Sequence, residues 1–483
     1  MYYKVQNYSF SNIDKFSTSS IVTRLTTDVT NVQQSYQMMM RIVIRAPLML
    51  IFSLIMAFSI NRKLSLIFLA IVPILIIGLF TIMRKVHPIF ESVFQTYDKL
   101  NTVVQENVRG IRVVKAFVTE EKEKKKFNKV SEEIYNKFTK AEKLLILNNP
   151  LMQFASYSAL ILISWFAAHF IVAGDLTTGQ LTSLITYTTQ ILTSLMMISM
   201  VFVMLTMSRA SGERIAEILT EESDLHNPEK PILKVEDGSI IFKDVDFSYV
   251  KDKNKLCLEN INLEIKSGET IGIIGGTGSS KSTFVQLIPR LYDVTDGEVL
   301  VGGKNVKEYD IETLRNEVSM VLQKNELFSG TIKENLRWGD ENATDEQIEK
   351  ACKLAQAHDF IKSFPNGYDT YIEQGGTNVS GGQKQRLCIA RALLKKPKIL
   401  ILDDSTSAVD TKTDSLIRTA FKEEIPNTTK LIIAQRIASV QDADKILVLD
   451  NGKINGFGTH EELLENNEIY KEVYYSQNRK EGV

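Results

Sequence analysis

The stretch ETIGIIGGTGSSKST, residues 269–283, decides the fold of the second half of the chain. It places a short apolar strand, a glycine-rich turn and the start of a helix in succession, which is the context that a phosphate-binding loop requires. Backbone N–H groups in such a turn and at the helix N-terminus favour phosphate oxygens. We therefore expect phosphate contacts from Gly275, Gly276, Thr277, Gly278, Ser279, Ser280, Lys281, Ser282 and Thr283.

Two side chains of this loop have chemical roles of their own. Lys281 has the reach to contact the β- and γ-phosphates of a nucleotide, and the hydroxyl of Ser282 can ligate Mg²⁺. The pattern GxxxxGK[ST] fails at one position, because Ser280 stands where the pattern has glycine. The serine adds a side chain near the phosphates but keeps its backbone N–H. We expect nucleotide binding to persist, with its affinity left open.

Two later segments strengthen this interpretation. KILILDDSTSAVD, residues 398–410, predicts a buried strand over 399–402 that ends in Asp403, whose carboxylate can hold Mg²⁺. NVSGGQKQR, residues 378–386, predicts a second anion site at a helix start, made by Ser380, Gly381, Gly382 and Gln383. Two such helix starts about a hundred residues apart imply one shared nucleotide or two copies that meet.

The first 210 residues contain long uncharged stretches. Between Lys143 and Arg209 the only formally charged residue is Asp175. A helix needs about 20 apolar residues to cross a bilayer, so these stretches are long enough. The alternative, buried helices of a large soluble protein, lacks other residues that could cover them. We predict four spans, over about 42–61, 64–83, 144–174 and 176–208.

Charges in the loops set the expected orientation and domain limits. The basic connection 84–143, which includes EEKEKKKF, is expected on the cytoplasmic side, and the Asp175 turn on the far side. The short NRK turn at 61–63 runs against this rule. Arg41 and Arg45 are expected at the lipid headgroups. We predict a transmembrane domain over 1–215, a linker over 216–235 and an α/β domain over 236–483.

Bulk composition excludes some kinds of site and partner. The formal net charge of −1 gives no bias toward nucleic acid, and we expect no nucleic-acid partner. Cys257, Cys352 and Cys388 lie far apart without the spacing of a metal site, which favours reduced thiols.

Two amphipathic segments lie outside the predicted spans, over residues 17–34 and 106–130. Each could be a solvated helix or a helix that docks on the α/β domain, and spacing alone leaves both open.

In this order and spacing, the motifs resemble those of ABC exporter half-transporters, in which a helical transmembrane domain is followed by an α/β P-loop ATPase domain. The resemblance covers essentially the whole chain, and SGGQ, residues 380–383, is the family signature. It implies ATP and Mg²⁺ as ligands and a dimer whose ATPase domains sandwich ATP head to tail. It also implies ATP-driven export of a small amphipathic molecule or lipid across the cell membrane, with the ATPase domain in the cytoplasm.

The resemblance also assigns roles to single residues. Tyr249, in FSY, matches the aromatic residue that stacks on adenine, and Asp410 matches a loop that contacts the partner domain. Gln323 matches the glutamine that couples Mg²⁺ to the helical subdomain. The expected metal ligands are Ser282, Gln323 and Asp403. The two amphipathic segments correspond to the family's coupling helices, which favours docking.

Two residues depart from the family where catalysis depends on them. The residue after the Mg²⁺ carboxylate is a glutamate in the family and Asp404 here, so the carboxylate is pulled back by about 1.5 Å, enough to spoil general-base geometry. The family's switch histidine is replaced by Gln435, which can donate a hydrogen bond but cannot shuttle a proton. The candidate catalytic residues are thus Asp404, Gln435 and Gln323.

Both departures, beside an intact SGGQ, favour an asymmetric heterodimer. Asp403, Asp404, Gln435 and the phosphate loop would form a weakly hydrolysing site with the partner's signature. The signature of this chain would complete the competent site, where a different half-transporter supplies the glutamate and the histidine. The expected partners are that second chain, the lipid bilayer and the transported molecule.

Length is a further departure, because the family has six membrane helices per half and this sequence predicts four. We expect the first two to be missing, through truncation or an internal start. The alternative function is a truncated or regulatory nucleotide-binding membrane protein that does not itself transport. Apart from Arg45, which is expected at the headgroups, the predicted spans hold no Asp, Glu, Lys or Arg that would mark a charged substrate. Tyr157, Trp165, Phe166 and Tyr187 suit an amphipathic drug or lipid, and they suit helix packing and interfacial anchoring equally well.

Overall fold

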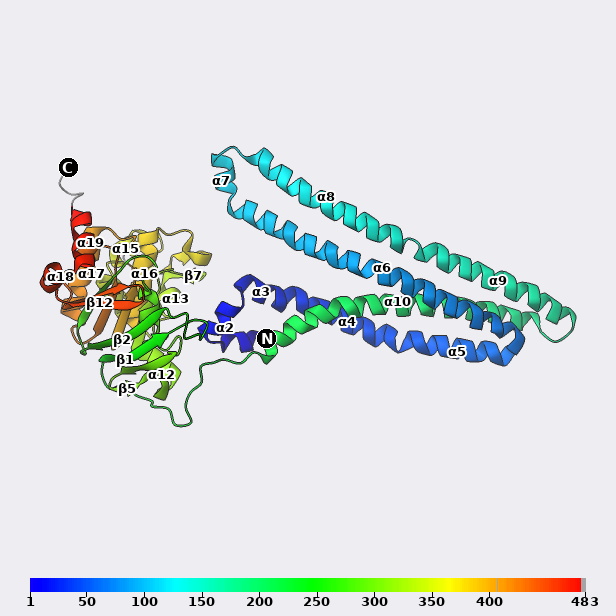
Figure 1. Ribbon diagram of the computed structural model, residues 1–483, viewed down its shortest axis with the longest axis horizontal. Helices are drawn as coiled ribbons and strands as arrows, with labels where there is room; N and C mark the ends of the chain where they lie inside the picture. The colour runs from blue at the N-terminus through cyan, green and yellow to red at the C-terminus, as the bar shows by residue number, and fades with distance from the viewer. Residues whose placement is uncertain (406, 479–483) are drawn as a thin grey trace. The chain divides into compact units, whose positions relative to one another are not determined.

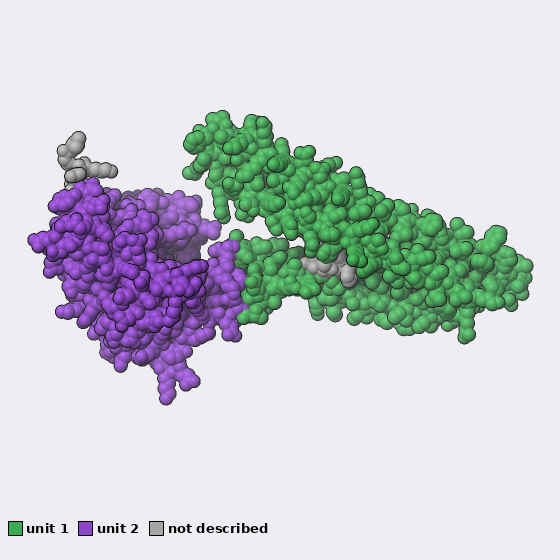
Figure 2. Space-filling view, in the orientation of Figure 1, with its two compact units in different colours: residues 1–2, 19–220 green, residues 3–18, 221–483 purple. Residues whose placement is uncertain are grey.

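The computed structural model describes residues 1–405 and 407–478 and divides into two compact units (Figure 2). The helical unit comprises Met1–Tyr2 and Ser19–Thr220, and the sheet unit comprises Tyr3–Thr18 and Glu221–Val483.

The helical unit contains long helices joined by short turns. Four helical runs in the described chain are long and apolar enough to cross a membrane, over Thr18–Ile60, Arg62–Arg109, Glu120–Val172 and Thr178–Val201. The elements are α3 (Thr18–Thr23), the π-helical turn Arg24–Asp28, α4 (Val29–Met38), the π-helical turn Met39–Val43, α5 (Arg45–Ile60), α6 (Arg62–Arg109), α7 (Ile111–Ala116), α8 (Glu120–Leu145), α9 (Asn148–Val172) and α10 (Thr178–Thr220).

These helices pack in pairs through small residues. Helix α5 lies along α10, while α6 lies along α8 and α9, and the short α7 links α6 and α8 at one end of the unit (Figure 1). Gly78 lies so close to Leu151 that an added Cβ would approach its side chain to 2.7 Å. Close approach at small residues is typical of helix packing in membranes. The fully buried small side chains include Ala57, Ala141, Ala159 and Ala167.

The outer surface of the same helices is apolar. Large side chains on α5, α6 and α9 are more than half exposed, a pattern expected where lipid rather than water covers a helix. They include Ile51, Phe52, Leu66, Leu69, Ile74, Ile77, Phe80, Phe154, Ile161 and Trp165.

The sheet unit is built on a six-stranded sheet in the order β12 (Lys453–Gly458), β11 (Lys445–Asp450), β3 (Thr270–Ile274), β10 (Thr429–Ile433), β9 (Ile399–Asp403) and β6 (Val318–Val321). All neighbours are parallel except the β11–β12 pair. Strands β9 and β10 are buried along their whole length, as parallel strands covered on both faces are.

A second sheet is antiparallel, in the order β2 (Leu258–Ile265), β1 (Ile240–Phe247), β4 (Asp296–Val301) and β5 (Lys304–Asn305). A small two-stranded antiparallel sheet pairs β7 (Gly330–Thr331) with β8 (Tyr371–Ile372). The helices of this unit are α2 (Phe10–Lys15), α11 (Lys281–Gln286), α12 (Ile311–Glu317), α13 (Ile332–Leu336), α14 (Asp345–Leu354), α15 (His358–Ser363), α16 (Gly381–Leu394), α17 (Thr411–Glu424), α18 (His460–Asn466) and α19 (Glu468–Asn478); α1 (Tyr2–Gln6) precedes α2.

The structure corrects two details of the sequence interpretation. Residues 17–34 begin the first long helical run, and the N-terminal segment that packs in the sheet unit is instead Tyr3–Thr18. The predicted linker began at residue 216, but α10 continues to Thr220, because its last turns are held by ion pairs of Arg24 with Glu217 and of Arg214 with Asp28.

Candidate nucleotide-binding site

Four predicted site segments meet at one edge of the six-stranded sheet. Strands β3, β10, β9 and β6 are parallel neighbours, so their carboxyl ends lie side by side. The phosphate loop follows β3, Gln435 follows β10, Asp404 follows β9 and Gln323 follows β6. Ligands of open parallel sheets bind at this carboxyl edge.

The phosphate loop turns tightly between β3 and α11. A Cβ at Gly275 would come within 2.2 Å of the Leu449 carbonyl oxygen, so this position requires glycine. Lys281 Nζ donates to the carbonyl oxygens of Gly275 (2.8 Å) and Gly276 (2.7 Å), which holds the lysine across the loop. Burial lowers the pKa of Lys281 despite the carboxylates of Asp403 and Asp404 nearby.

Ser280 has a backbone conformation that glycine adopts without strain. Its φ of 69° and ψ of 25° lie in the left-handed region. A residue with a Cβ is strained there by about 1 kcal/mol. The substitution therefore keeps the course of the loop, at a conformational cost that glycine would avoid.

Two of the three predicted Mg²⁺ ligands, Ser282 and Asp403, are in contact. Ser282 Oγ donates to Asp403 Oδ1 over 3.0 Å. Asp403 is only 3% exposed, and burial raises its pKa, with the hydrogen bond from Ser282 acting in the opposite direction. Among the described residues, no group of three or more His, Cys, Asp or Glu side chains is placed to hold a metal ion by itself. A hydroxyl and a carboxylate fit Mg²⁺, which is usually bound by few protein oxygens together with phosphate and water.

Asp404 and Gln435 are also brought together. Gln435 Nε2 donates to Asp404 Oδ2 over 2.7 Å, and the backbone N–H of Asp404 donates to the Ile433 carbonyl across the β9–β10 edge. Burial raises the pKa of Asp404, while hydrogen bonds from Gln435 and Gln323 oppose that change. Asp404 has a φ of 48°, a left-handed conformation that Asp adopts more readily than most residues.

Tyr249 lies beside the same loop with part of its ring exposed. Its hydroxyl is 2.9 Å from Thr283 Oγ1, and its ring makes an edge contact with Tyr292 at 5.1 Å between centroids. The residue is 44% exposed, so part of it is accessible to a ligand. The structure thus holds Tyr249, the phosphate loop and α11 in one neighbourhood.

The predicted second anion site is a well-formed helix start. Ser380 caps α16, with its Oγ accepting from the backbone N–H of Gln383, and Gln383 Oε1 accepts from the Ser380 N–H at 2.9 Å. Gly382 faces the Ala408 carbonyl, which an added Cβ would approach to 2.8 Å. In the described part of the chain, no hydrogen bond or ion pair joins residues 380–383 to the phosphate loop.

Hydrogen bonds that the sequence analysis did not predict join α16 to the loop between β9 and α17. Gln385 on α16 donates to Ser407 Oγ (3.3 Å) and accepts from the Ala408 N–H (3.0 Å), in the loop that leads to Asp410. Asp410 caps α17 by accepting from the Thr413 N–H. The sequence analysis did not single out Gln385, because a glutamine inside a helix carries no pattern that reveals its partner.

The N-terminal helix α2 forms a second group of missed contacts. Asp14 accepts a hydrogen bond from the Tyr292 hydroxyl (2.5 Å), and the Phe10 ring lies against Tyr292. Ser9 and Ser11 both donate to Asp224. Burial alone raises the pKa of Asp224, but these hydroxyls and Lys251 lower it to about 2. Tyr292 also contacts Tyr249, so a single side chain, that of Tyr292, connects α2 with the candidate nucleotide site.

Comparison with known proteins agrees with this arrangement. The family described as ABC transporter transmembrane region matches residues 1–195, and the family described as ABC transporter matches residues 258–407. An uncharacterized ABC transporter ATP-binding protein, YfiB of Bacillus subtilis, is 41% identical over all of this chain and 83% of its own length.

Two further proteins are similar over nearly the whole chain. An ATP-dependent lipid A-core flippase of Desulfotalea psychrophila is 32% identical over 98% of this chain and 82% of its own length. A bacterial Atm1-family ABC exporter solved with ATP bound superposes with a TM-score of 0.85 at 26% identity, covering 99% of this chain and 83% of that structure.

Proposed function

Because this chain belongs to the ABC transporter family, with a membrane-spanning region fused to an ATPase domain, we propose that it is the slowly hydrolysing subunit of an asymmetric exporter. ATP hydrolysis coupled to transport is the activity of this family. The asymmetry rests on one observation, the hydrogen bond between Asp404 and Gln435, which occupy the positions where the family has glutamate and histidine.

At the chain's own site, the residues bind ATP better than they hydrolyse it. The phosphate loop offers backbone N–H groups and Lys281 to the phosphates, and Tyr249 offers its ring to the adenine. Mg²⁺ would be held by Ser282 and Asp403, with Gln323 nearby, and would neutralise charge on the phosphates. Asp404 is one methylene shorter than the usual base and already accepts a hydrogen bond from Gln435, so it polarises an attacking water poorly.

The signature SGGQ, in contrast to the chain's own ATP site, matches the family pattern. Ser380 and Gln383 cap each other, and the N-terminal N–H groups of α16 point to where a phosphate can bind. This start of α16 makes no hydrogen bond to the chain's own phosphate loop within the described residues. It is therefore assigned to ATP held by a second chain, whose glutamate and histidine would perform hydrolysis.

Coupling to transport is assigned to α2 and α7. Helix α2 lies on Tyr292, which touches the ring proposed to stack on adenine. Helix α7 presents exposed apolar residues, among them Val113 (60%) and the following Phe117 (74%), for a partner surface. ATP-driven closure of the paired ATPase domains would be passed through these helices to the membrane helices.

The proposed cargo is an amphipathic small molecule or lipid, and the proposed location is the cell membrane with the ATPase domain in the cytoplasm. The flippase relative is consistent with a lipid cargo.

The test is ATPase turnover of the purified chain in lipid, alone and then co-expressed with its partner half-transporter. We expect near-zero turnover alone and a rise of at least about tenfold on pairing, because only the partner supplies a competent base. Equal and vigorous turnover by the chain alone would contradict the asymmetric assignment.

A further inference from the structure

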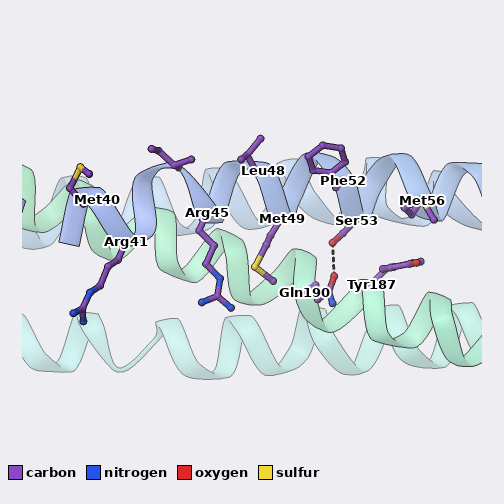
Figure 3. A pocket seen from close by; sticks show the side chains of 11 residues that line it. Met40, Arg41, Arg45, Leu48, Met49, Phe52, Ser53, Met56, Tyr187 and Gln190 are labelled. Carbon is purple, nitrogen blue, oxygen red and sulfur yellow. Dashed lines mark hydrogen bonds between the residues drawn. The ribbon is translucent and has the colours of Figure 1, made fainter. Parts of the chain in front are cut away.

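A pocket of about 660 Å³ lies within the helical unit, between the first helical run and α10 (Figure 3). This volume is in the range of small-molecule sites, roughly 300–1,000 Å³. Arg41, Arg45, Met49 and Ser53 follow one another at intervals of four residues and leave the same side of their helical run (Figure 3). The sequence interpretation placed the two arginines at the lipid headgroups, whereas the structure places them along the wall of this pocket.

The two arginines differ from the others on the same elements. Along the first helical run and α10, Arg24 pairs with Glu217, Arg209 with Glu213, and Arg214 with Asp28. Within the described chain, neither Arg41 nor Arg45 has an ion-pair or hydrogen-bond partner, and both side chains are exposed to the pocket.

The parts of the two helices that line the pocket carry no acidic residue. Residues 29–90 contain no Asp or Glu, and neither do residues 176–212. At 1.5 Å per residue, the nearest acid on the first helical run, Asp28, is about 20 Å from Arg41. Two like charges one turn apart repel each other, and unpaired charges within a membrane helix are typical of ligand or ion pathways. The pocket therefore carries two positive charges that this chain leaves unbalanced.

Beyond the arginines the lining becomes apolar. Met49, Phe52 and Met56 line the pocket together with Tyr187 of α10, and Ser53 Oγ donates to Gln190 Oε1 at 2.8 Å. From Arg41 to Ser53 the wall is about 18 Å long. Methionine side chains adapt to differently shaped apolar ligands. The pocket thus has a cationic end and an apolar end.

We propose that this pocket binds an amphipathic anion, with a phosphate or carboxylate held by Arg41 and Arg45 and an apolar body along Met49, Phe52 and Met56. Arginine suits this task, because its planar guanidinium can donate two parallel hydrogen bonds to either oxyanion. The inference deepens the proposed export function, on which it rests, by assigning the cargo a negative charge.

The experiment measures binding of dodecyl phosphate to the assembled transporter in phosphatidylcholine nanodiscs. The wild type is compared with the double variant Arg41→Gln/Arg45→Gln and with Arg62→Gln, an arginine of α6 outside the pocket. We expect the double variant to weaken binding at least tenfold and Arg62→Gln to change it less than twofold. Thermal unfolding and ATP binding of each variant check that the fold is intact.

The apolar end is tested separately with matched ligands. Inorganic phosphate lacks the apolar body and dodecyltrimethylammonium reverses the charge, so both are expected to bind at least tenfold more weakly than dodecyl phosphate. Phe52→Ala should weaken dodecyl phosphate but leave inorganic phosphate unchanged. Repeating the measurement with phosphatidic acid in the nanodisc identifies the source of the ligand: competition indicates a bilayer lipid, and its absence indicates a soluble amphiphile.

Equal binding of dodecyl phosphate to the wild type and the Arg41→Gln/Arg45→Gln variant would overturn the inference, as would preferred binding of the cationic probe. This result is distinguishable from failure of the proposed function, because ATPase turnover of the same complex is measured without any probe. If the complex hydrolyses ATP and the substitutions leave probe binding unchanged, the proposed export function stands and the proposed negative charge of the cargo is rejected.

Discussion

Two helix starts in the sheet unit are proposed to bind phosphate, at α16 and at α11. They differ in their capping hydrogen bonds and in their backbone conformation. At the start of α16, Ser380 and Gln383 cap one another with no positive φ between them. At the start of α11, Ser280 is held in a left-handed conformation, and the nearby Asp404 is left-handed as well. The start of α16, which we propose contacts ATP held by a second chain, therefore keeps the family motif SGGQ, while the loop before α11 and residue 404 depart from the family pattern.

The largest effect should separate these two helix starts directly. Gly381→Glu adds a carboxylate at the N-terminus of α16, where the assigned phosphate would lie, without a steric clash, since an added Cβ lies 3.6 Å from Ala408. We expect ATPase turnover of the paired transporter to fall about 100-fold. Lys281→Ala, which weakens only the chain's own site, should reduce it no more than about fivefold.

The reverse order of these two effects would contradict the proposal that the nucleotide contacted by α16 is the one hydrolysed. If Lys281→Ala abolished turnover and Gly381→Glu spared it, the chain's own nucleotide would be the one hydrolysed. ATP binding by each variant controls for loss of the fold.

The second effect concerns the pair Asp404 and Gln435. Asp404→Glu alone should raise hydrolysis at the chain's own site less than about twofold, because Gln435 still cannot shuttle a proton. Asp404→Glu/Gln435→His together should raise it at least about tenfold. Single-turnover hydrolysis in the assembled transporter measures both.

A large gain from Asp404→Glu alone would show that carboxylate length is the whole defect. Asp404→Asn is the matched control, since it keeps the size of the side chain and removes the charge.

Much of this arrangement could be predicted because sequence motifs mark the ends of parallel strands. ETIGIIGGTGSSKST and KILILDDSTSAVD each place a strand before the chemistry, and parallel strands bring their carboxyl ends to one edge. The membership of the ABC transporter family and the helical-plus-sheet architecture are confirmed. The roles of Asp404, Gln435 and Gln323 stay predictions.

Other features could not be predicted, because they depend on long-range geometry. Helix α2 is only six residues long, and its partners Asp224 and Tyr292 lie more than 200 residues away. The direction in which the Arg41 and Arg45 side chains point depends on two π-helical turns, at Arg24–Asp28 and Met39–Val43. Each extra residue in such a turn rotates the side chains that follow by about 100° around the helix axis. A prediction from the regular period of about 3.6 residues therefore places them on the wrong face.

A smaller effect should appear in stability. Burial raises the pKa of Asp403 above its value in the unfolded chain, so the folded state without ligand favours the protonated carboxyl. Its stability is therefore lowered above the folded pKa and recovers as pH falls toward the ordinary aspartate range. Asp403→Asn should raise the thermal midpoint of the nucleotide-free sheet unit by roughly 2–4 °C while removing the extra stabilisation by Mg²⁺.

Differential scanning fluorimetry with and without MgATP measures this change, and the exposed Asp359→Asn is its control. A lower midpoint for Asp403→Asn without ligand would mean that the ionised carboxylate supports the empty fold.

The smallest effect is expected from Ser280→Gly. Relief of about 1 kcal/mol of left-handed strain is offset by the flexibility that glycine adds to the unfolded chain. We expect MgATP affinity to change less than about threefold, measured by calorimetry on the purified transporter. A tenfold gain would show that the serine side chain itself hinders the phosphates.

The most direct test identifies the nucleotide that each chain holds after many turnovers. Photo-crosslinking of radiolabelled ATP in the paired transporter, followed by separation of the two chains and analysis of the bound nucleotide, measures it. The account predicts intact ATP on this chain and ADP on its partner. ADP on this chain, formed at the rate of overall turnover, would contradict it.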